Sequence, residues 1–174
     1  MLALLARWLY AAQLPPDAPL ESVDARGYHA LALNLLAGRG FTLSAEPPFV
    51  PDAIRTPLYP AFVAALYAVG GRVPALVAWV QGLLDAATAL VLVDLVRRVT
   101  GGGWWAWAAG LLYALNPTAW RFSNELLTEI LLAAVLAWLL WVFVRLAHGG
   151  EWRWLVAVGV LAGLAPLIKP NVVG

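Results

Sequence analysis

Residues 55–71 read RTPLYPAFVAALYAVGG, and the course of this stretch decides the fold. Its apolar part, Leu58 to Val69, lies between a proline-rich entry and Gly70-Gly71. A helix needs about 20 apolar residues to cross a hydrocarbon core about 30 Å thick, so this segment is short for a membrane span. Whether it crosses the membrane or lies at its surface determines on which side every later loop emerges.

The composition predicts an integral membrane protein. Hydrophobic residues make up 63% of the 174-residue chain and charged residues only 12%, whereas a soluble domain of this size needs more polar surface. A net charge of +1 without a Lys/Arg cluster argues against nucleic acid as a partner. The chain has no cysteine, which excludes a disulfide, a thiolate nucleophile and a cysteine metal site.

The apolar segments predict an all-α polytopic membrane module. Residues 1–14 are interpreted as part of a first span, and residues 15–57 as a polar outer loop with an amphipathic helix at about 24–37, which Gly38-Arg39-Gly40 ends. Residues 58–70 are expected to form an interfacial or re-entrant helix. Four later segments have the character of spans: 73–98, 104–120, 126–147 and 152–168.

The distribution of arginines supports this placement of residues 58–70. If that segment crossed the membrane, the turn after 73–98 would lie on the same side as the loop 15–57. If it does not cross, four arginines fall on one side, as the positive-inside rule favours: Arg97, Arg98, Arg145 and Arg153. The loop 15–57, the region 116–129 and Lys169 then share the outer face.

Three carboxylates on that face are candidate site residues. Asp24 stands at the start of the amphipathic helix, where it either satisfies free N–H groups or belongs to a site. Glu125 and Glu129 share one face at the mouth of 126–147, and carboxylates so near the hydrocarbon are costly without a partner or water. The alternative for both is an interaction with the helix dipole. Glu129 is the deeper of the two and the stronger candidate.

Two cations on the same face are candidate phosphate ligands. Arg55 precedes two prolines that stiffen the chain, and a planar guanidinium suits paired hydrogen bonds to a lipid phosphate. The alternative is an arginine that extends toward the headgroups. Lys169 ends an apolar run on the side that the charge bias disfavours, either as a second anion contact or as a helix-end lysine.

A different reading rests on polar residues within the spans. Gln81 and Asp85 lie one turn apart in 73–98, where they either hydrogen-bond between helices or, with Glu129, line a polar path in a non-enzymatic binding or transport subunit. His29 and His148 fall on opposite faces, so no histidine metal cluster is predicted. No cofactor is identified with certainty, and a divalent metal on the carboxylates is left open.

Several motifs resemble one family. The runs Asp24-Ala25-Arg26-Gly27-Tyr28, Gly38-Arg39-Gly40-Phe41 and Arg55-Thr56-Pro57-Leu58-Tyr59-Pro60 resemble the first outer loop of the C-superfamily (GT-C) glycosyltransferases, which include protein O-mannosyltransferases and lipid A aminoarabinose transferases. The resemblance covers nearly the whole chain, since it continues through Gln81, Asp85, Asn116-Pro117, Leu126-Leu127-Thr128-Glu129 and Lys169-Pro170.

The resemblance implies a sugar transfer from a polyprenyl-phosphate donor to a lipid, glycan or protein acceptor. Asp24 would be the general base or orient the acceptor, Glu129 would be the second acid near the sugar, and Arg55 with Lys169 would contact the donor phosphate. These roles suit a transition state that is positive at the sugar and negative at the leaving phosphate. Further residues implied to line the site are Tyr28, Tyr59, Glu125 and Arg26.

The resemblance also implies a setting. The chain is expected to be embedded in a bacterial-type cytoplasmic (inner) membrane, in contact with membrane lipids, with its site on the extracytoplasmic face. The aminoarabinose transferases have an arginine where this chain has Gly27, with Arg26 one position earlier. Members of the family are several hundred residues long, and this chain corresponds to their N-terminal module, so the resemblance does not imply that the module is active by itself.

Overall fold

The computed structural model describes residues 2–13, 15, 18–149 and 151–170. Of the predicted segments 1–14 and 15–57, residues 1, 14, 16 and 17 lie outside the described residues. The described residues form no strand, only an isolated bridge between Thr42 and Pro51. They form these helices: α1 (Leu2–Ala11), η1 (Ala18–Leu20), α2 (Val23–Leu36), α3 (Leu58–Gly70), α4 (Pro74–Thr100), α5 (Trp104–Ala114), α6 (Pro117–Asn124), α7 (Glu129–Ala147) and α8 (Trp152–Ile168). The prediction of an all-α membrane module is confirmed.

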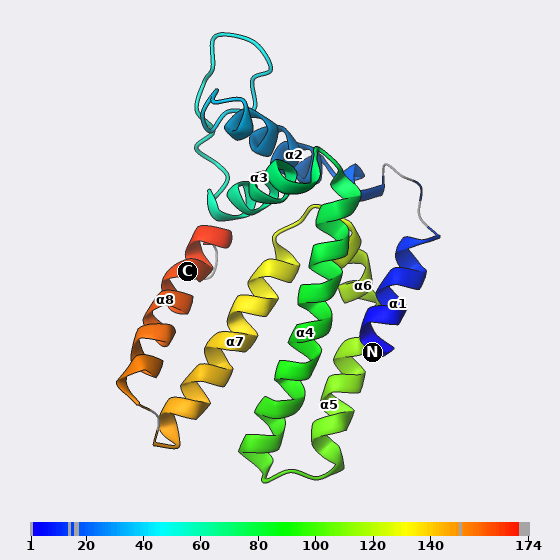
Figure 1. Ribbon diagram of the computed structural model, residues 1–174, viewed down its shortest axis with the longest axis vertical. Helices are drawn as coiled ribbons and strands as arrows, with labels where there is room; N and C mark the ends of the chain where they lie inside the picture. The colour runs from blue at the N-terminus through cyan, green and yellow to red at the C-terminus, as the bar shows by residue number, and fades with distance from the viewer. Residues whose placement is uncertain (1, 14, 16–17, 150, 171–174) are drawn as a thin grey trace.

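The helices α4, α7 and α8 run side by side along the long axis of the molecule (Figure 1). α4 also lies against α5, α6 and α1. Both α4 and α7 are long and apolar enough to cross a membrane. The bundle exposes large apolar side chains such as Leu90, Leu112 and Phe143. An apolar exterior of this kind is the surface that lipid chains require.

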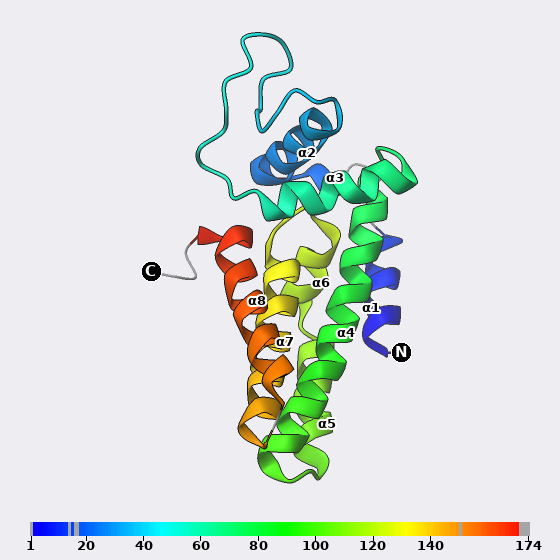
Figure 2. The ribbon, with the colours of Figure 1, turned by 60° about the vertical axis from the view of Figure 1, so that its left-hand side comes forward.

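α2 and α3 lie across one end of the bundle (Figure 1), and Figure 2 shows the same arrangement from a second direction. α3 begins after Pro57 and ends at Gly71, whose φ of 82° suits glycine at a helix end. Pro74 then occupies the first turn of α4. The short segment 58–70 therefore turns the chain into α4 at the end where α2 lies. A shared apolar core holds α2, α3 and the start of α4 together: Ala25, Ala32, Tyr59, Val63, Tyr67, Val77 and Leu126.

Residues 104–120, predicted as one span, are divided between two helices. α5 ends at Ala114 and α6 starts at Pro117. Proline has no N–H and disfavours a helical conformation at the residue before it, which interrupts the helix. Asn116 caps α6, because its side-chain oxygen accepts a hydrogen bond of 2.9 Å from the backbone N–H of Thr118. The segment therefore runs along the bundle in two pieces.

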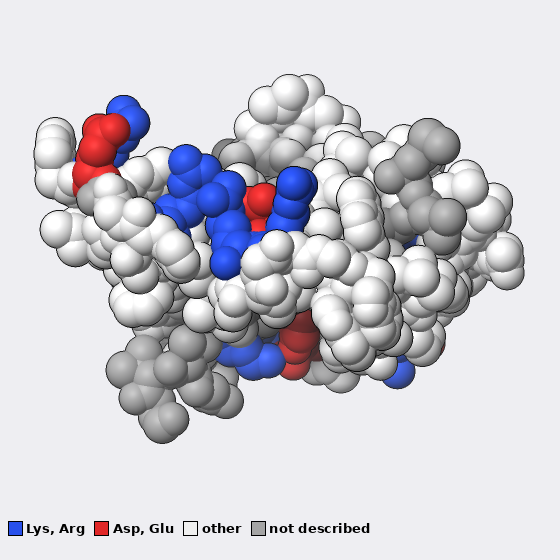
Figure 3. Space-filling model, turned by 90° about the horizontal axis from the view of Figure 1, so that it is seen from below, with Lys and Arg blue, Asp and Glu red and all other residues white. Residues whose placement is uncertain are grey.

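The two ends of the bundle carry different residues. The α4–α5 and α7–α8 turns both lie at the end away from α2 and α3 (Figure 1), and Figure 3 shows basic side chains gathered there. These include Arg98, Arg145 and Arg153, which line one hollow, and Arg97, which lines its neighbour. The opposite end carries the start of α2, the start of α3 and the end of α8. Such a distribution is the one expected for a chain in which residues 58–70 do not cross the membrane.

A buried charge pair joins three helices inside the bundle. The Nε of Arg7 donates to Oδ2 of Asp85, and the Tyr113 hydroxyl donates to the other carboxylate oxygen. The Arg7 guanidinium also donates to the carbonyl of Ala114, at 3.1 Å. Asp85 is fully buried. Since an ion inside a membrane protein is costly without its counter-ion, this pair fixes α1 and α5 to α4.

Replacement of Asp85 should therefore destabilise the protein strongly. Asp85→Ala leaves a buried guanidinium without its carboxylate, and we expect a loss of about 3–5 kcal/mol in the free energy of unfolding. The matched control is Glu151→Ala, which removes an exposed partner of Arg153 and should cost less than about 1 kcal/mol. Unfolding of both variants in detergent measures the difference. Equal losses of unfolding free energy in the two variants would contradict a structural role for the Arg7–Asp85 pair.

Candidate functional site

The first turn of α2 directs Asp24 toward the loop that follows. Ser22 is the N-cap of α2, because its hydroxyl accepts a hydrogen bond of 3.2 Å from the backbone N–H of Ala25. The Asp24 side chain is 67% exposed, and its Oδ1 accepts a hydrogen bond of 3.1 Å from Nη2 of Arg55. Asp24 is thus not the cap of its helix, and its carboxylate faces a cation.

Arg55 bridges two carboxylates. Its Nη1 donates to Oδ2 of Asp52 at 3.0 Å, whereas its Nη2 donates to Asp24. Oδ1 of Asp52 accepts from the backbone N–H groups of Ile54, at 2.7 Å, and of Arg55, at 3.0 Å. Burial raises the pKa of the Asp52 carboxyl, but these backbone N–H groups and the guanidinium outweigh burial and hold that pKa below its usual range. Asp52 therefore fixes both the backbone and the side chain of Arg55.

Gly27 allows Arg55 to lie against α2. A Cβ atom at position 27 would lie 2.8 Å from both Cζ and Nη2 of Arg55. The same guanidinium lies 5.7 Å from the centre of the Tyr28 ring, a cation–π distance. Arg55 therefore fills the space that a side chain at position 27 would take.

A second ion pair joins the start of α7 to the end of α8. Nζ of Lys169 donates to Oε1 of Glu129 at 2.9 Å, and both side chains are about one-third exposed. The hydroxyl of Thr56 donates to the carbonyl of Ile168 at 2.6 Å. Because Thr56 follows Arg55 and Ile168 precedes Lys169, this hydrogen bond brings the segments of the two cations together.

Tyr28 lies beside Arg55, and its phenol is influenced by one carboxylate of each ion pair. Burial raises the pKa of this phenol, the negative charges of Asp24 and Glu129 raise it further, and Arg55 and Thr128 lower it in part. The net effect raises the pKa of Tyr28 above its ordinary value, so the phenol stays protonated near neutral pH and can donate a hydrogen bond. We call this group the Tyr28 cluster: Asp24, Tyr28, Arg55, Glu129 and Lys169.

Three other candidate residues have structural partners. Tyr59 is buried and its ring packs edge-on against Tyr28, with the ring centres 4.9 Å apart. The Arg26 guanidinium donates to the carbonyl of Glu21 at 3.1 Å. Glu125 is buried and its carboxylate accepts a hydrogen bond of 2.9 Å from Arg121. Tyr59 thus packs against Tyr28 from the protein interior, whereas the charged groups of Arg26 and Glu125 interact with residues outside the Tyr28 cluster.

Gln81 ties the Tyr28 cluster to the bundle. Its side-chain oxygen accepts from the Tyr59 hydroxyl at 2.5 Å, and its nitrogen donates to the carbonyls of Ser123, at 3.2 Å, and Glu125, at 2.7 Å. Asp85 is held by Arg7 and Tyr113, and Glu129 by Lys169. The three residues of the polar-path alternative therefore have separate partners, a pattern typical of contacts between helices.

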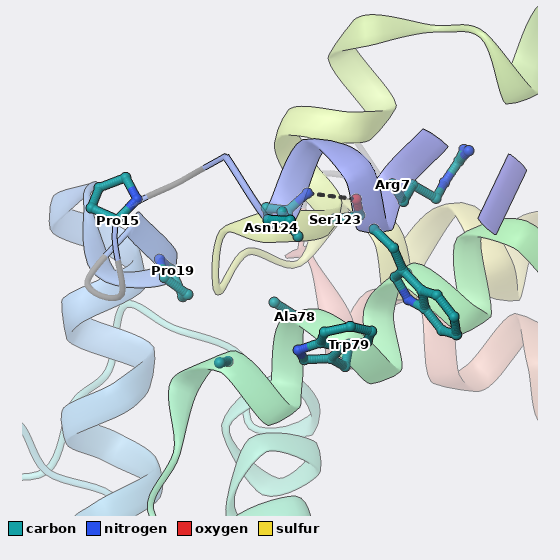
Figure 4. A pocket seen from close by; sticks show the side chains of 12 residues that line it. Arg7, Pro15, Pro19, Ala78, Trp79, Ser123 and Asn124 are labelled. Atoms are coloured by element: carbon teal, nitrogen blue, oxygen red, sulfur yellow. Dashed lines mark hydrogen bonds between the residues drawn. The ribbon is translucent and has the colours of Figure 1, made fainter. Parts of the chain in front are cut away.

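A small apolar cavity lies apart from this cluster. It holds about 130 Å³ between α1, α4 and α6, and Figure 4 shows Arg7, Trp79, Ser123 and Asn124 at its wall. Trp8 packs against Trp79 there, with the ring centres 4.9 Å apart. None of the residues that line this cavity belongs to the Tyr28 cluster. In the part of the chain that the structure describes, no three His, Asp or Glu side chains are placed to hold a metal ion.

The lowered pKa of Asp52 predicts a pH-dependent stability. A carboxyl whose pKa is lower in the folded state stabilises the fold above its ordinary pKa, and that stabilisation is lost as the pH falls through the folded-state value. At pH 7 we therefore expect Asp52→Asn to melt a few degrees below the wild type. The difference in melting temperature should shrink as the pH falls below about 4. A difference that stays constant with pH would contradict the role of this carboxylate.

Comparison with known proteins agrees with the fold. The family model described as dolichyl-phosphate-mannose-protein mannosyltransferase matches residues 54–173, which is more than half of the chain. The matched region contains Arg55, Glu129 and Lys169, and Asp24 precedes it. No curated protein and no solved structure matched the chain in the corresponding searches. With its apolar helices α4 and α7, the chain is an integral membrane protein that belongs to the dolichyl-phosphate-mannose-protein mannosyltransferase family, membrane glycosyltransferases of the GT-C type.

Proposed function

We propose that the Tyr28 cluster is the transfer site for a sugar carried on polyprenyl phosphate. The observation that carries this proposal is the pairing of two carboxylates with two cations around one protonated phenol, at one end of an apolar bundle. Glycosyl transfer from a phosphate needs both kinds of group, because positive charge develops at the sugar while negative charge develops at the leaving phosphate.

Asp24 is proposed as the general base. An acceptor hydroxyl attacks the anomeric carbon of the sugar and gives its proton to the Asp24 carboxylate. The bond between that carbon and the phosphate oxygen breaks, and its electron pair leaves with the polyprenyl phosphate. The exposed side chain of Asp24 is accessible to an acceptor, and a positioned base of this kind accelerates proton transfer. Glu129 is proposed to stabilise the positive charge that develops on the sugar ring.

Arg55 is proposed to hold the donor phosphate. Its Nε–H is buried and has no hydrogen-bond partner among the described residues. A buried donor without a partner is rare in folded proteins, and a phosphate that shifted the guanidinium could satisfy it. When a phosphate takes the place of Asp24, the bond to Asp52 still holds the guanidinium in position. Donor binding would in this way release the Asp24 carboxylate for the acceptor.

Lys169 is proposed as the second phosphate ligand. It now pairs with Glu129, and exchange of that carboxylate for a phosphate oxygen would free Glu129 for the sugar. The Tyr28 phenol, beside Arg55, stays protonated and can donate a hydrogen bond to the phosphate or to a sugar hydroxyl. The two ion pairs therefore neutralise all four charges, and a donor phosphate would exchange for one carboxylate in each pair.

The orientation proposed for the site follows from the arginines at the other end. Positively charged residues near span ends favour the cytoplasmic side. The end with Arg98, Arg145 and Arg153 would then face the cytoplasm, and the Tyr28 cluster would lie on the extracytoplasmic face of a bacterial-type inner membrane. Polyprenyl phosphates anchored in that leaflet would present their phosphates at the depth of the cluster.

Loss of the base should abolish transfer and leave donor binding intact. We expect Asp24→Asn to lower the rate of sugar release from a radiolabelled polyprenyl-phosphate mannose by about 10²- to 10⁴-fold. The matched control is Glu46→Gln, which neutralises an exposed acid in the same loop and should keep the wild-type rate. An Asp24→Asn rate equal to that of the control would contradict the proposal.

Donor binding should depend on Arg55 and on the space above Gly27. We expect Arg55→Ala to weaken binding of polyprenyl phosphate to the purified chain at least tenfold, which corresponds to about 1.4 kcal/mol or more. Gly27→Ala should weaken binding in the same direction, because its methyl group would displace the guanidinium. Arg26→Ala removes a neighbouring arginine whose donors face backbone carbonyls and should have little effect. Equal weakening by Arg26→Ala would refute a specific role for Arg55.

A further inference from the structure

A hollow lined by basic and aromatic residues lies at the end of the bundle away from the Tyr28 cluster. Its volume is about 500 Å³, and its wall combines the ends of α4, α7 and α8 with the turn between the last two. Figure 3 looks onto this end of the molecule and shows the basic side chains gathered there. We call this hollow the arginine–tryptophan pocket; its lining includes Arg98, Arg145, His148, Glu151, Arg153 and Trp154.

Arg145 is held between two tryptophan rings in this pocket. Its Cζ lies 4.9 Å from the centre of the Trp141 ring and 5.1 Å from that of Trp154. Within the described residues, no carboxylate lies at ion-pair distance from Arg145. Contacts with aromatic faces restrict the guanidinium without neutralising it. Arg145 therefore presents a positioned positive charge, unlike an arginine that moves freely in the headgroup region.

The neighbouring groups leave the pocket positively charged. Arg98 pairs with Asp94 at 2.6 Å, and Trp141 donates to the same carboxylate at 2.7 Å. Arg153 pairs with Glu151 at 2.9 Å, through side chains that are mostly exposed. Three arginines from three different helices thus meet two carboxylates around one hollow. The excess charge and the planar guanidinium groups suit a phosphate, which accepts paired hydrogen bonds.

We propose that the arginine–tryptophan pocket binds the phosphate of an anionic membrane lipid. A lipid rather than a soluble anion is indicated by the surroundings, since basic pockets between membrane helices bind anionic headgroups. Exposed tryptophans at the same end mark the depth of the membrane interface. Large apolar side chains on α7 and α8 are exposed along the bundle and offer a surface for the acyl chains: Leu140, Phe143, Leu155 and Val156.

Such a lipid would join the three helices that line the pocket. Its phosphate would bridge Arg98 of α4, Arg145 of α7 and Arg153 beyond the α7–α8 turn. A ligand that binds only the folded protein stabilises it, and the stabilisation grows with the logarithm of the ligand concentration above the dissociation constant. The lipid is distinct from the sugar donor, because the pocket and the Tyr28 cluster lie at opposite ends of the bundle (Figure 1).

The test compares three probes on the purified chain in a neutral detergent: phosphatidylglycerol, phosphatidylcholine and inorganic phosphate. Native mass spectrometry measures bound lipid, and the melting temperature measures stabilisation. We expect phosphatidylglycerol to bind saturably and to raise the melting temperature, with at least tenfold weaker binding of the other two. Equal binding of phosphatidylcholine would overturn the proposal, and tight binding of inorganic phosphate would show a site for a soluble anion instead.

Variants of single arginines separate the pocket from a general charge effect. We expect Arg145→Gln to weaken phosphatidylglycerol binding at least tenfold, and Arg145→Lys, which keeps the charge but loses the planar group, to weaken it less. The matched control is Arg97→Gln, which removes the same charge at the end of α4 but does not line this pocket. Equal weakening by Arg97→Gln and Arg145→Gln would overturn the proposal. If Arg145→Gln does not fold, Arg145→Lys takes its place in the comparison. Wild-type phosphatidylglycerol binding by Arg145→Lys, together with weaker binding by Arg97→Gln, would then overturn the proposal.

Discussion

The buried amide of Gln81 is the interaction on which the arrangement of this protein depends. It is fully buried and uses both its oxygen and its nitrogen, toward Tyr59 of α3 and toward the backbone before α7. A polar group inside an apolar bundle must be satisfied within the protein, so these bonds are costly to break. They hold α3 across the end of α4 and fix the turn that leads to Glu129. Tyr59, held in this way, is the surface against which Tyr28 packs.

The ion pairs of the Tyr28 cluster connect this arrangement of helices to the proposed chemistry. Each cation of the Tyr28 cluster has a carboxylate partner, and Arg55 has a second one in Asp52. A phosphate can take the place of a carboxylate on a guanidinium or an ammonium because both anions accept charge-assisted hydrogen bonds. Exchange at both pairs would expose two carboxylates at the moment the sugar arrives. The second carboxylate of Arg55 matters in this account, since it keeps the guanidinium in place during the exchange.

Part of the fold and part of the site could be predicted from the sequence. The all-α class follows from long apolar segments, and the placement of residues 58–70 follows from their short length and from the side on which Arg97 and Arg145 fall. Asp24, Arg55, Glu129 and Lys169 could be singled out because charges near hydrocarbon are rare. The structure pairs Asp24 with Arg55 and Glu129 with Lys169, and the Thr56–Ile168 hydrogen bond links the segments of the two cations; their roles in transfer stay a proposal.

Other features depend on contacts between distant segments. Arg7 is the partner of Asp85, and the opposite charges of two apolar segments were the available signal for that pair. Asp52 holds Arg55 through a local turn, for which the spacing of an acid three residues before an arginine was the signal. The close approach of Arg55 to Gly27 had no such signal, because it depends on how α2 and the loop pack in three dimensions.

The proposed site requires that the ion pairs of the Tyr28 cluster open to receive a phosphate. The decisive measurement is a structure of the chain with polyprenyl phosphate bound. We expect one phosphate in contact with both Arg55 and Lys169, with Arg55 still bonded to Asp52 and with Asp24 and Glu129 released from their cations. A bound phosphate that leaves both ion pairs closed, or that contacts neither Arg55 nor Lys169, would show that the pairs do not serve as the phosphate site.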